Sequence, residues 1–137
     1  MGDETVARIG PGLLVLVGIE GGDGSEDVAI AVDKIIGLRI FPDEIGKMNL
    51  SIGEIGGAIL VVSQFTLVGD VRRGRRPSFG AAADPSLAAH LIEEMVVGFR
   101  RVGIATGSGM FGASMQVELV NDGPVTLVFD VRHARLG

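Results

Sequence analysis

The amino-acid sequence predicts a single α+β domain that spans residues 1–137. Three observations lead to this prediction: long apolar runs typical of buried strands, only two segments with helical spacing of apolar residues, and 22 irregularly placed glycines. With 47% hydrophobic residues, a chain of this length can bury a core and is too apolar to be disordered. Neither an internal repeat nor a linker divides it.

The first half of the chain predicts a strand, a helix and a short strand. Residues 12–19 are a β-branched and leucine-rich run bounded by glycine, which is typical of a buried strand. Ser25 is the predicted N-cap of a helix that ends near Gly37. Residues 39–41 predict a short strand, and the glycine-rich, polar residues 42–57 predict a loop. The apolar face of the helix comprises Val28, Ala31, Val32, Ile35 and Ile36.

The second half predicts a long strand, a second helix and two closing strands. Residues 58–68 form the strongest strand pattern in the chain. Asp84 is the predicted N-cap of the second helix, with Pro85 at its first position. Residues 115–120 and 125–131 are the predicted closing strands, joined by a turn. The apolar face of the second helix comprises Leu87, Leu91, Met95, Phe99 and Val102.

Composition excludes several classes of function. There is no cysteine, so disulfides, thiolate metal sites and a cysteine nucleophile are excluded together. The net charge of −5 argues against broad binding to nucleic acid, and we expect no DNA partner. No apolar run is long enough to span a bilayer, and residues 1–4 show no signal peptide, so we expect a cytoplasmic protein without a membrane partner.

The positive charge is nevertheless concentrated in one segment, "VRRGRRPSF". It contains four of the twelve basic residues, which are Arg72, Arg73, Arg75 and Arg76. One interpretation is a solvated loop that keeps a sheet soluble. The other is a local RNA-binding surface, and this segment is where an RNA partner would bind first.

Several familiar motifs fail in their context. Residues 107–112, "GSGMFG", match the dinucleotide-binding pattern, but a helix precedes them and a strand is predicted after them, which is the reverse of what that site needs. His90 and His133 lack metal-ligand spacing, and His90 is one helical turn before Glu94, a common surface pair. We therefore expect no metal and no cofactor.

The stretch Ser63-Gln64-Phe65-Thr66 is unusual because polar residues interrupt an apolar strand. On a strand, Gln64 and Thr66 would share one face, and Ser63 and Phe65 the other. Either these polar groups bind neighbouring backbone at a strand end, or they form the wall of a polar cleft.

Four segments together resemble the D-aminoacyl-tRNA deacylase family, also known as the D-tyrosyl-tRNA deacylases. They are "RIFPDEIGKMN" (39–49), "LVVSQFTL" (60–67), "RRGRRPSF" (72–79) and "FGASMQVELVNDGPVTL" (111–127). The resemblance extends from about Ile9 to Asp130 and is specific because the elements occur in this order and at this separation.

This resemblance implies hydrolysis of the ester between a D-amino acid and the 3′ end of tRNA by a homodimer. It implies a barrel-like fold of largely antiparallel or mixed sheet with two main helices. It also implies that a cis Gly123-Pro124 dipeptide of one subunit enters the site of the other and rejects L-amino acids. Ser63, Gln64 and Phe65 would line the pocket, with Phe65 giving its backbone N–H. Thr126 would belong to the second motif, and Phe111 and Met115 would contact the terminal adenosine and the pocket floor.

Two chemistries are compatible with these residues. Thr126 is a possible nucleophile, but no general base beside it is evident. We favour activation of water by the 2′-hydroxyl of the terminal ribose, with the oxyanion bound by N–H groups. Because glycine has no side chain, glycyl-tRNA should be hydrolysed as well.

The sequence departs from the family pattern in two places. Family members usually begin with a further strand that carries a Gln-Arg-Val segment, where this sequence begins "MGDETVARIG". Without that strand a sheet edge would be exposed and Gly123-Pro124 less well supported. Met110 stands where an arginine is common. These departures leave open a second hypothesis, a catalytically impaired relative that binds RNA ends or another protein. A third, a β-rich oligomer that binds a small molecule, requires the motif matches to be coincidence.

Overall fold

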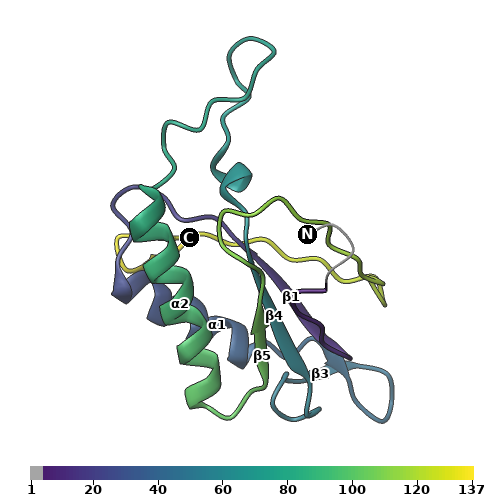
Figure 1. Ribbon diagram of the computed structural model, residues 1–137. Coiled ribbons are helices and arrows are strands. Elements are labelled where there is room, and N and C mark those ends of the chain that lie inside the picture. Colours follow the sequence, from purple (N-terminus) through teal and green to yellow (C-terminus); the bar gives the residue numbers. More distant parts are fainter. Residues whose placement is uncertain (1–4) are drawn as a thin grey trace.

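The computed structural model describes residues 5–137 (Figure 1). The prediction about a signal peptide concerns residues 1–4, which lie outside this range. Within residues 5–137, no helix is both long enough and apolar enough to cross a membrane. The elements in chain order are β1 (Gly12–Val17), α1 (Ser25–Gly37), β2 (Phe41–Pro42), β3 (Met48–Leu50), β4 (Ala58–Ser63), the 3₁₀ turn η1 (Phe65–Val68), α2 (Pro85–Arg101), β5 (Thr106–Ser108), β6 (Val131–Arg132) and β7 (Arg135–Leu136).

The centre of the fold is a parallel three-stranded sheet with the order β1-β4-β5. Leu14 pairs with Leu60, and Leu60 with Gly107, so β4 is the central strand. β2 with β3 and β6 with β7 form two small antiparallel sheets. The predicted α+β class with mixed sheets and two main helices is confirmed. The barrel-like closure is wrong for the described residues, because β1 and β5 are the outer strands of an open sheet.

The hydrophobic core lies between this sheet and the two helices, which both cover the same side of it (Figure 1). Alternation along β4 directs Ile59 and Val61 into this core, where both are fully buried. Most residues of the two predicted apolar helix faces also belong to this core, and Phe99 of α2 is fully buried in it. The buried positions that the helical spacing predicted are Val28, Val32, Ile35, Leu91, Met95 and Phe99.

Helix boundaries follow local capping chemistry. Asp84 is the N-cap of α2 and Pro85 its first residue, as predicted, and the Asp84 carboxylate accepts a hydrogen bond from Ser86 at 2.6 Å. The predicted N-cap at Ser25 is wrong by one residue. Gly24 occupies that position, and Asp27 Oδ2 accepts the Gly24 N–H at 2.9 Å, which satisfies the backbone donor at the helix start.

The long strand predicted over residues 58–68 ends at Ser63. Gln64 leaves the strand, and residues 65–68 form η1, in which the Leu67 N–H donates to the carbonyl of Gln64 at 3.1 Å. The strand-face arrangement predicted for residues 63–66 is therefore wrong after Ser63. Among the short strands, β3 and β5 lie where no strand was predicted, while β2 begins two residues later than expected and includes Pro42.

The two closing strands predicted at residues 115–120 and 125–131 are also wrong, apart from Val131 in β6. Their apolar sequences resemble strands, but a strand requires a hydrogen-bonded neighbour, and within residues 5–137 neither segment has one. Their side chains instead remain largely exposed. Val120 is 91% exposed and Val128 is 90% exposed.

Candidate functional site

The end of β4 places polar groups beside an exposed aromatic ring. The Gln64 N–H donates to the carbonyl of Val17 at 2.7 Å, which holds this end of the strand against β1. As the chain turns into η1, Gln64 Nε2 donates to Thr66 Oγ1 at 2.5 Å. The amide and the hydroxyl thus form one polar cluster at the strand end, created by the turn.

Phe65 carries a backbone donor and an exposed ring at the start of η1. It is the first residue of η1, so its N–H has no acceptor within the turn. Its ring is 58% exposed and meets Phe79 edge to face, with ring centroids 5.0 Å apart. This contact restrains the orientation of Phe65, whose N–H the family resemblance places in the pocket.

The loop after β5 brings Met115 to the same end of β4. The Gly109 N–H donates to the carbonyl of Val61 at 3.1 Å. A Cβ at Gly109 would lie 3.2 Å from Met115 Sδ and 4.0 Å from a methyl group of Val62, so the methionine side chain packs closely against the Gly109 backbone. Phe111 lies on the same loop and is partly exposed. Met115 is therefore beside the strand end, while Phe111 faces solvent.

The turn at residues 121–126 is ordered by a single side chain. Asn121 Nδ2 donates to Thr126 Oγ1 at 2.8 Å, and Asn121 Oδ1 accepts the Val125 N–H at 3.3 Å. The Gly123–Pro124 peptide bond is cis, and both residues are exposed. Gly123 has a φ of +130°, and a Cβ there would lie 3.0 Å from Val125 Cγ2. Both facts require glycine at this position.

The predicted residues therefore form two groups. Ser63, Gln64, Phe65 and Met115 gather at the end of β4. Gly123, Pro124 and Thr126 lie on the exposed turn, and no hydrogen bond between described residues joins that turn to residues 63–65. Asn121 was absent from the predicted set, although its position five residues before Thr126 in "NDGPVT" was a usable signal.

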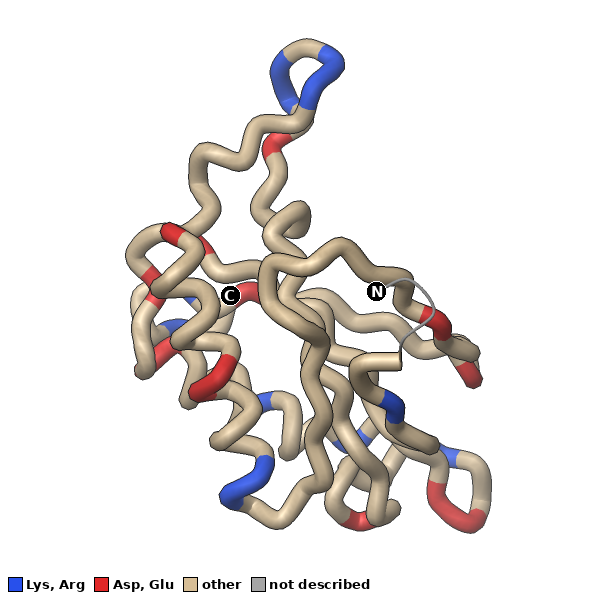
Figure 2. Tube along the Cα trace, in the orientation of Figure 1, with Lys and Arg blue, Asp and Glu red and all other residues tan. Residues whose placement is uncertain are grey.

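The four predicted arginines lie on a loop that extends from the molecule beyond η1 (Figure 2). Arg72 forms two hydrogen bonds with the carboxylate of Asp70, at 2.9 and 2.7 Å. This pairing lowers the pKa of Asp70 and raises the pKa of Arg72. Asp70 was not predicted, although it stands two residues before Arg72, so the signal was present in the sequence.

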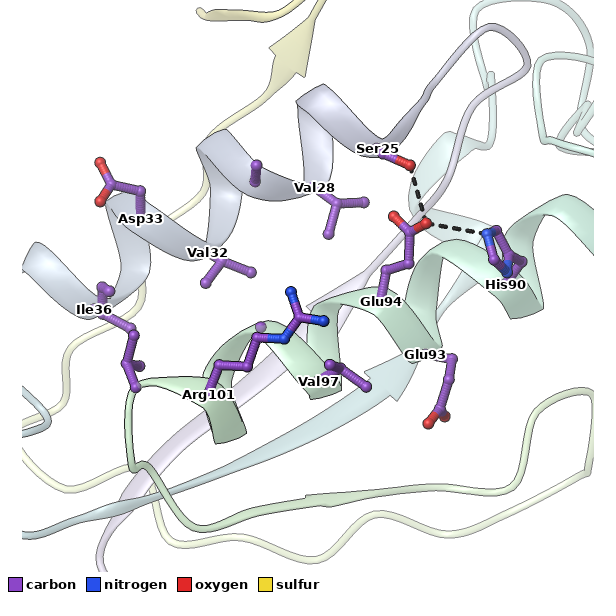
Figure 3. A pocket seen from close by; sticks show the side chains of 13 residues that line it. Ser25, Val28, Val32, Asp33, Ile36, His90, Glu93, Glu94, Val97 and Arg101 are labelled. Carbon is purple, nitrogen blue, oxygen red and sulfur yellow. Dashed lines mark hydrogen bonds and ion pairs between the residues drawn. The ribbon is translucent and has the colours of Figure 1, made fainter.

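A second group of polar residues lies in a groove of about 590 Å³ between α1 and α2 (Figure 3). Ser25 Oγ donates to Glu94 Oε1 at 2.9 Å, and His90 Nε2 lies 3.0 Å from the same oxygen, which confirms the predicted His90–Glu94 pair. In a hydrolytic triad the histidine lies between the serine and the acid, where it can take the serine proton. Here the carboxylate lies between them, so this group does not form that triad.

The described residues thus form a small α+β domain in which an amide, a hydroxyl and backbone groups gather at the end of β4. Comparison with known proteins identifies the family. The sequence model of the family described as D-Tyr-tRNA(Tyr) deacylase matches residues 1–130, and the chain belongs to this family.

Individual relatives agree with this assignment. A D-aminoacyl-tRNA deacylase from Clostridioides difficile (strain 630) is 55% identical over 128 residues, which cover 93% of this chain and 86% of the relative. Another, from Chloroflexus aurantiacus, is 54% identical over 133 residues, covering 97% and 83%. Among solved structures, the c-Myc DNA Unwinding Element Binding Protein is 38% identical with a TM-score of 0.86, covering 92% of this chain and 86% of that one. A probable eukaryotic D-amino acid tRNA deacylase, 20% identical with a TM-score of 0.71 over 82% of this chain and 81% of that one, shares the fold.

Proposed function

We propose that this protein hydrolyses the ester bond of D-aminoacyl-tRNA and releases free tRNA and the D-amino acid. The family assignment and relatives of that name at about 55% identity support this activity. The observation that carries the rest of the proposal is the division of the site. No hydrogen bond between described residues joins the polar strand end to the Gly123-Pro124 turn, which supports a site that a second copy completes with its own turn.

A homodimer would unite the two groups. The segments on either side of the turn expose apolar side chains, and Val120 and Val128 are almost fully exposed on the single chain. Exposed apolar surface of this kind marks a contact with another protein surface. A second copy that covers these segments would bring its own turn with it, because residues 121–126 lie between them.

The turn would select handedness by shape. Its Asn121 hydrogen bonds hold the backbone still, and glycine leaves the backbone carbonyls uncovered. Carbonyls directed at the substrate Cα tolerate a hydrogen on that side and collide with a side chain. D-amino acids would therefore enter, and L-amino acids would be excluded by steric conflict and unpaired polar groups.

Substrate-assisted chemistry fits the site better than a threonine nucleophile. Thr126 Oγ1 already accepts a hydrogen bond from Asn121, and the strand end supplies amide and backbone donors. The 2′-hydroxyl of the terminal ribose adjoins the ester and can orient the attacking water. The N–H of Phe65 would bind the oxyanion, a contribution of about 3–4 kcal/mol for one such donor. Because its substrate is charged tRNA, we place the activity in the cytoplasm.

One assay tests the function directly. The same tRNA would be charged with D-tyrosine, L-tyrosine or glycine, and ester loss followed over time. We expect rapid hydrolysis of the D-ester, slow hydrolysis of the L-ester, and hydrolysis of the glycyl ester, since glycine has a side chain on neither face. An inert glycyl ester beside a reactive D-ester would refute selection by shape.

The competing function is a relative that binds RNA ends or another protein without turnover. The departure that supports it is Met110, which is half exposed and which the sequence resemblance places at a position where arginine is expected. The same assay separates the two. Tight tRNA binding, measured beside the assay, without loss of any of the three esters would establish the binding function instead.

A further inference from the structure

The arginine-rich segment forms a finger of defined shape, which we define as residues 71–77. Two reciprocal backbone hydrogen bonds close its base, from the Asp70 N–H to the Ser78 carbonyl at 2.7 Å and from the Ser78 N–H to the Asp70 carbonyl at 2.8 Å. Gly74, with a φ of +66°, makes the reversal between the two arginine pairs. All seven residues are exposed, and the finger extends away from the sheet and helices (Figure 1).

Its four arginines are not equivalent. Arg72 is held at the base by the Asp70 carboxylate, which also accepts the Arg72 N–H at 2.9 Å. Within residues 5–137, the ion pairs of the structure involve Arg72, His90 and Arg132, and none includes Arg73, Arg75 or Arg76. Arg72 is therefore paired with a carboxylate, whereas the other three arginines of the finger have no ion pair among the described residues. Figure 2 shows the basic residues gathered on this projecting loop.

The finger is also connected to the candidate site. Phe79, one residue past the closing bridge, packs edge to face on Phe65 at 5.0 Å. A Cβ at Gly69, the residue before the bridge, would lie 2.8 Å from the Phe79 ring, so the ring fits closely over the finger's root. From Gly69, the five residue steps to Gly74 span at most about 18 Å. Groups bound by the finger would thus be near the ester site but separate from it.

We propose that Arg73, Arg75 and Arg76 bind backbone phosphates of the tRNA strand that leads to the aminoacylated end, and that Arg72 is a positioning residue. This inference rests on the proposed function. Guanidinium groups bind phosphate oxygens in bidentate fashion, and a protein of net charge −5 needs such a local cationic surface to approach RNA. Solubility alone does not require an ordered loop, whereas the base of this finger is fixed by two backbone hydrogen bonds and an ion pair.

Salt dependence of tRNA binding measures each contact. A phosphate contact contributes about 0.7–0.9 to the slope of log affinity against log salt concentration. The full-length protein and its single variants would be titrated with uncharged tRNA over a range of salt. We expect R75Q to reduce the slope by about 0.7–0.9, the value of one phosphate contact. The triple variant R73Q/R75Q/R76Q should reduce it by about two to three in total. R72Q should leave the slope at the wild-type value. K34Q, which removes an exposed charge on α1, is the matched control.

A slope that falls equally in R72Q and R75Q would overturn the division of roles, and an unchanged slope in the triple variant would overturn phosphate binding altogether. Truncated substrates give a second readout. The triple variant should lose at least tenfold more kcat/KM on D-tyrosyl-tRNA than on D-tyrosyl-adenosine, which lacks upstream phosphates. Equal losses on both would contradict the proposal.

Failure of the proposed function is distinguishable from failure of this inference. If the wild-type protein hydrolyses neither D-tyrosyl-tRNA nor D-tyrosyl-adenosine, the enzymatic proposal is wrong. The salt slopes with uncharged tRNA then decide the role of the finger by themselves.

Discussion

Asn121 donates a hydrogen bond from Nδ2 to Oγ1 of Thr126 at 2.8 Å, across the turn that carries Gly123 and Pro124. The same asparagine accepts the backbone N–H of Val125 through Oδ1. One side chain thus fixes both sides of the turn. The hydroxyl that the sequence suggested as a nucleophile accepts a bond that maintains the turn.

Replacing Thr126 should therefore affect turn geometry more than chemistry. We expect T126A to lower kcat/KM on D-aminoacyl-tRNA by less than about tenfold, equivalent to about 1.4 kcal/mol of barrier. A substrate with a 2′-deoxy terminal ribose should lose about a hundredfold or more with the wild-type enzyme, because it lacks the group that orients water. Single-turnover rates measure both. The opposite ranking would restore Thr126 as the nucleophile.

Adding one methyl group at Gly123 should directly disturb the turn that we propose to exclude L-amino acids. In G123A the new Cβ would lie 3.0 Å from Val125 Cγ2 in a backbone conformation with φ of +130°. Strain of this kind costs about 1–3 kcal/mol. We expect at least a tenfold loss of D-ester hydrolysis. G37A is the control, since a Cβ at Gly37 meets nothing within 4 Å. Full activity in G123A would show that the turn does not approach the substrate.

Proline at residue 65 removes the proposed oxyanion donor. In F65P the backbone N–H is absent, and proline is tolerated at the first position of a helical turn. F65A loses the same aromatic contact with Phe79 but keeps the N–H, so the difference between the two variants isolates the donor. We expect kcat of F65P to be about 10²–10³-fold below that of F65A. Thermal melts would verify that both variants fold. Equal kcat values would exclude the N–H from catalysis.

Charge placed on the apolar segments should separate the dimer. Val120 and Val128 are almost fully exposed on the single chain, and a carboxylate buried there in an interface would be unpaired. We expect light scattering to give a dimer mass for the wild type and a monomer mass for V120D/V128D. I45D is the matched control, because Ile45 is 84% exposed on the β2–β3 turn. A wild-type monomer would contradict the two-copy site.

Periodicity was sufficient to predict the centre of the fold. The apolar runs predicted β1 and all six residues of β4, and the helical spacing predicted the buried faces of α1 and α2. β3 and β5 have three residues each, too few for a pattern to emerge. The closing segments failed for a different reason. Their composition is typical of strands, but pairing depends on a distant partner, which a local pattern does not specify.

The candidate site residues were predictable where their side-chain type differs from that of their sequence neighbours. Polar Ser63 and Gln64 stand out in an apolar strand, and Gly-Pro stands out between two apolar segments. The 3₁₀ turn that brings Gln64 to Thr66 was not predictable, because the apolar residues after it continue the strand pattern. The Asp70–Arg72 pair was not predicted, because the four arginines were considered without the acidic residue beside them.

The central claim is that the turn of one copy completes the site of the other, and mixed dimers test it most directly. F65P supplies a normal turn with a defective pocket, and G123V supplies a normal pocket with a defective turn. The two would be co-expressed with different affinity tags and purified by both. Each parent dimer should be nearly inactive on D-tyrosyl-tRNA, whereas the mixed dimer has one complete site of two and should recover about half of the wild-type rate. A mixed dimer as inactive as its parents would contradict the account.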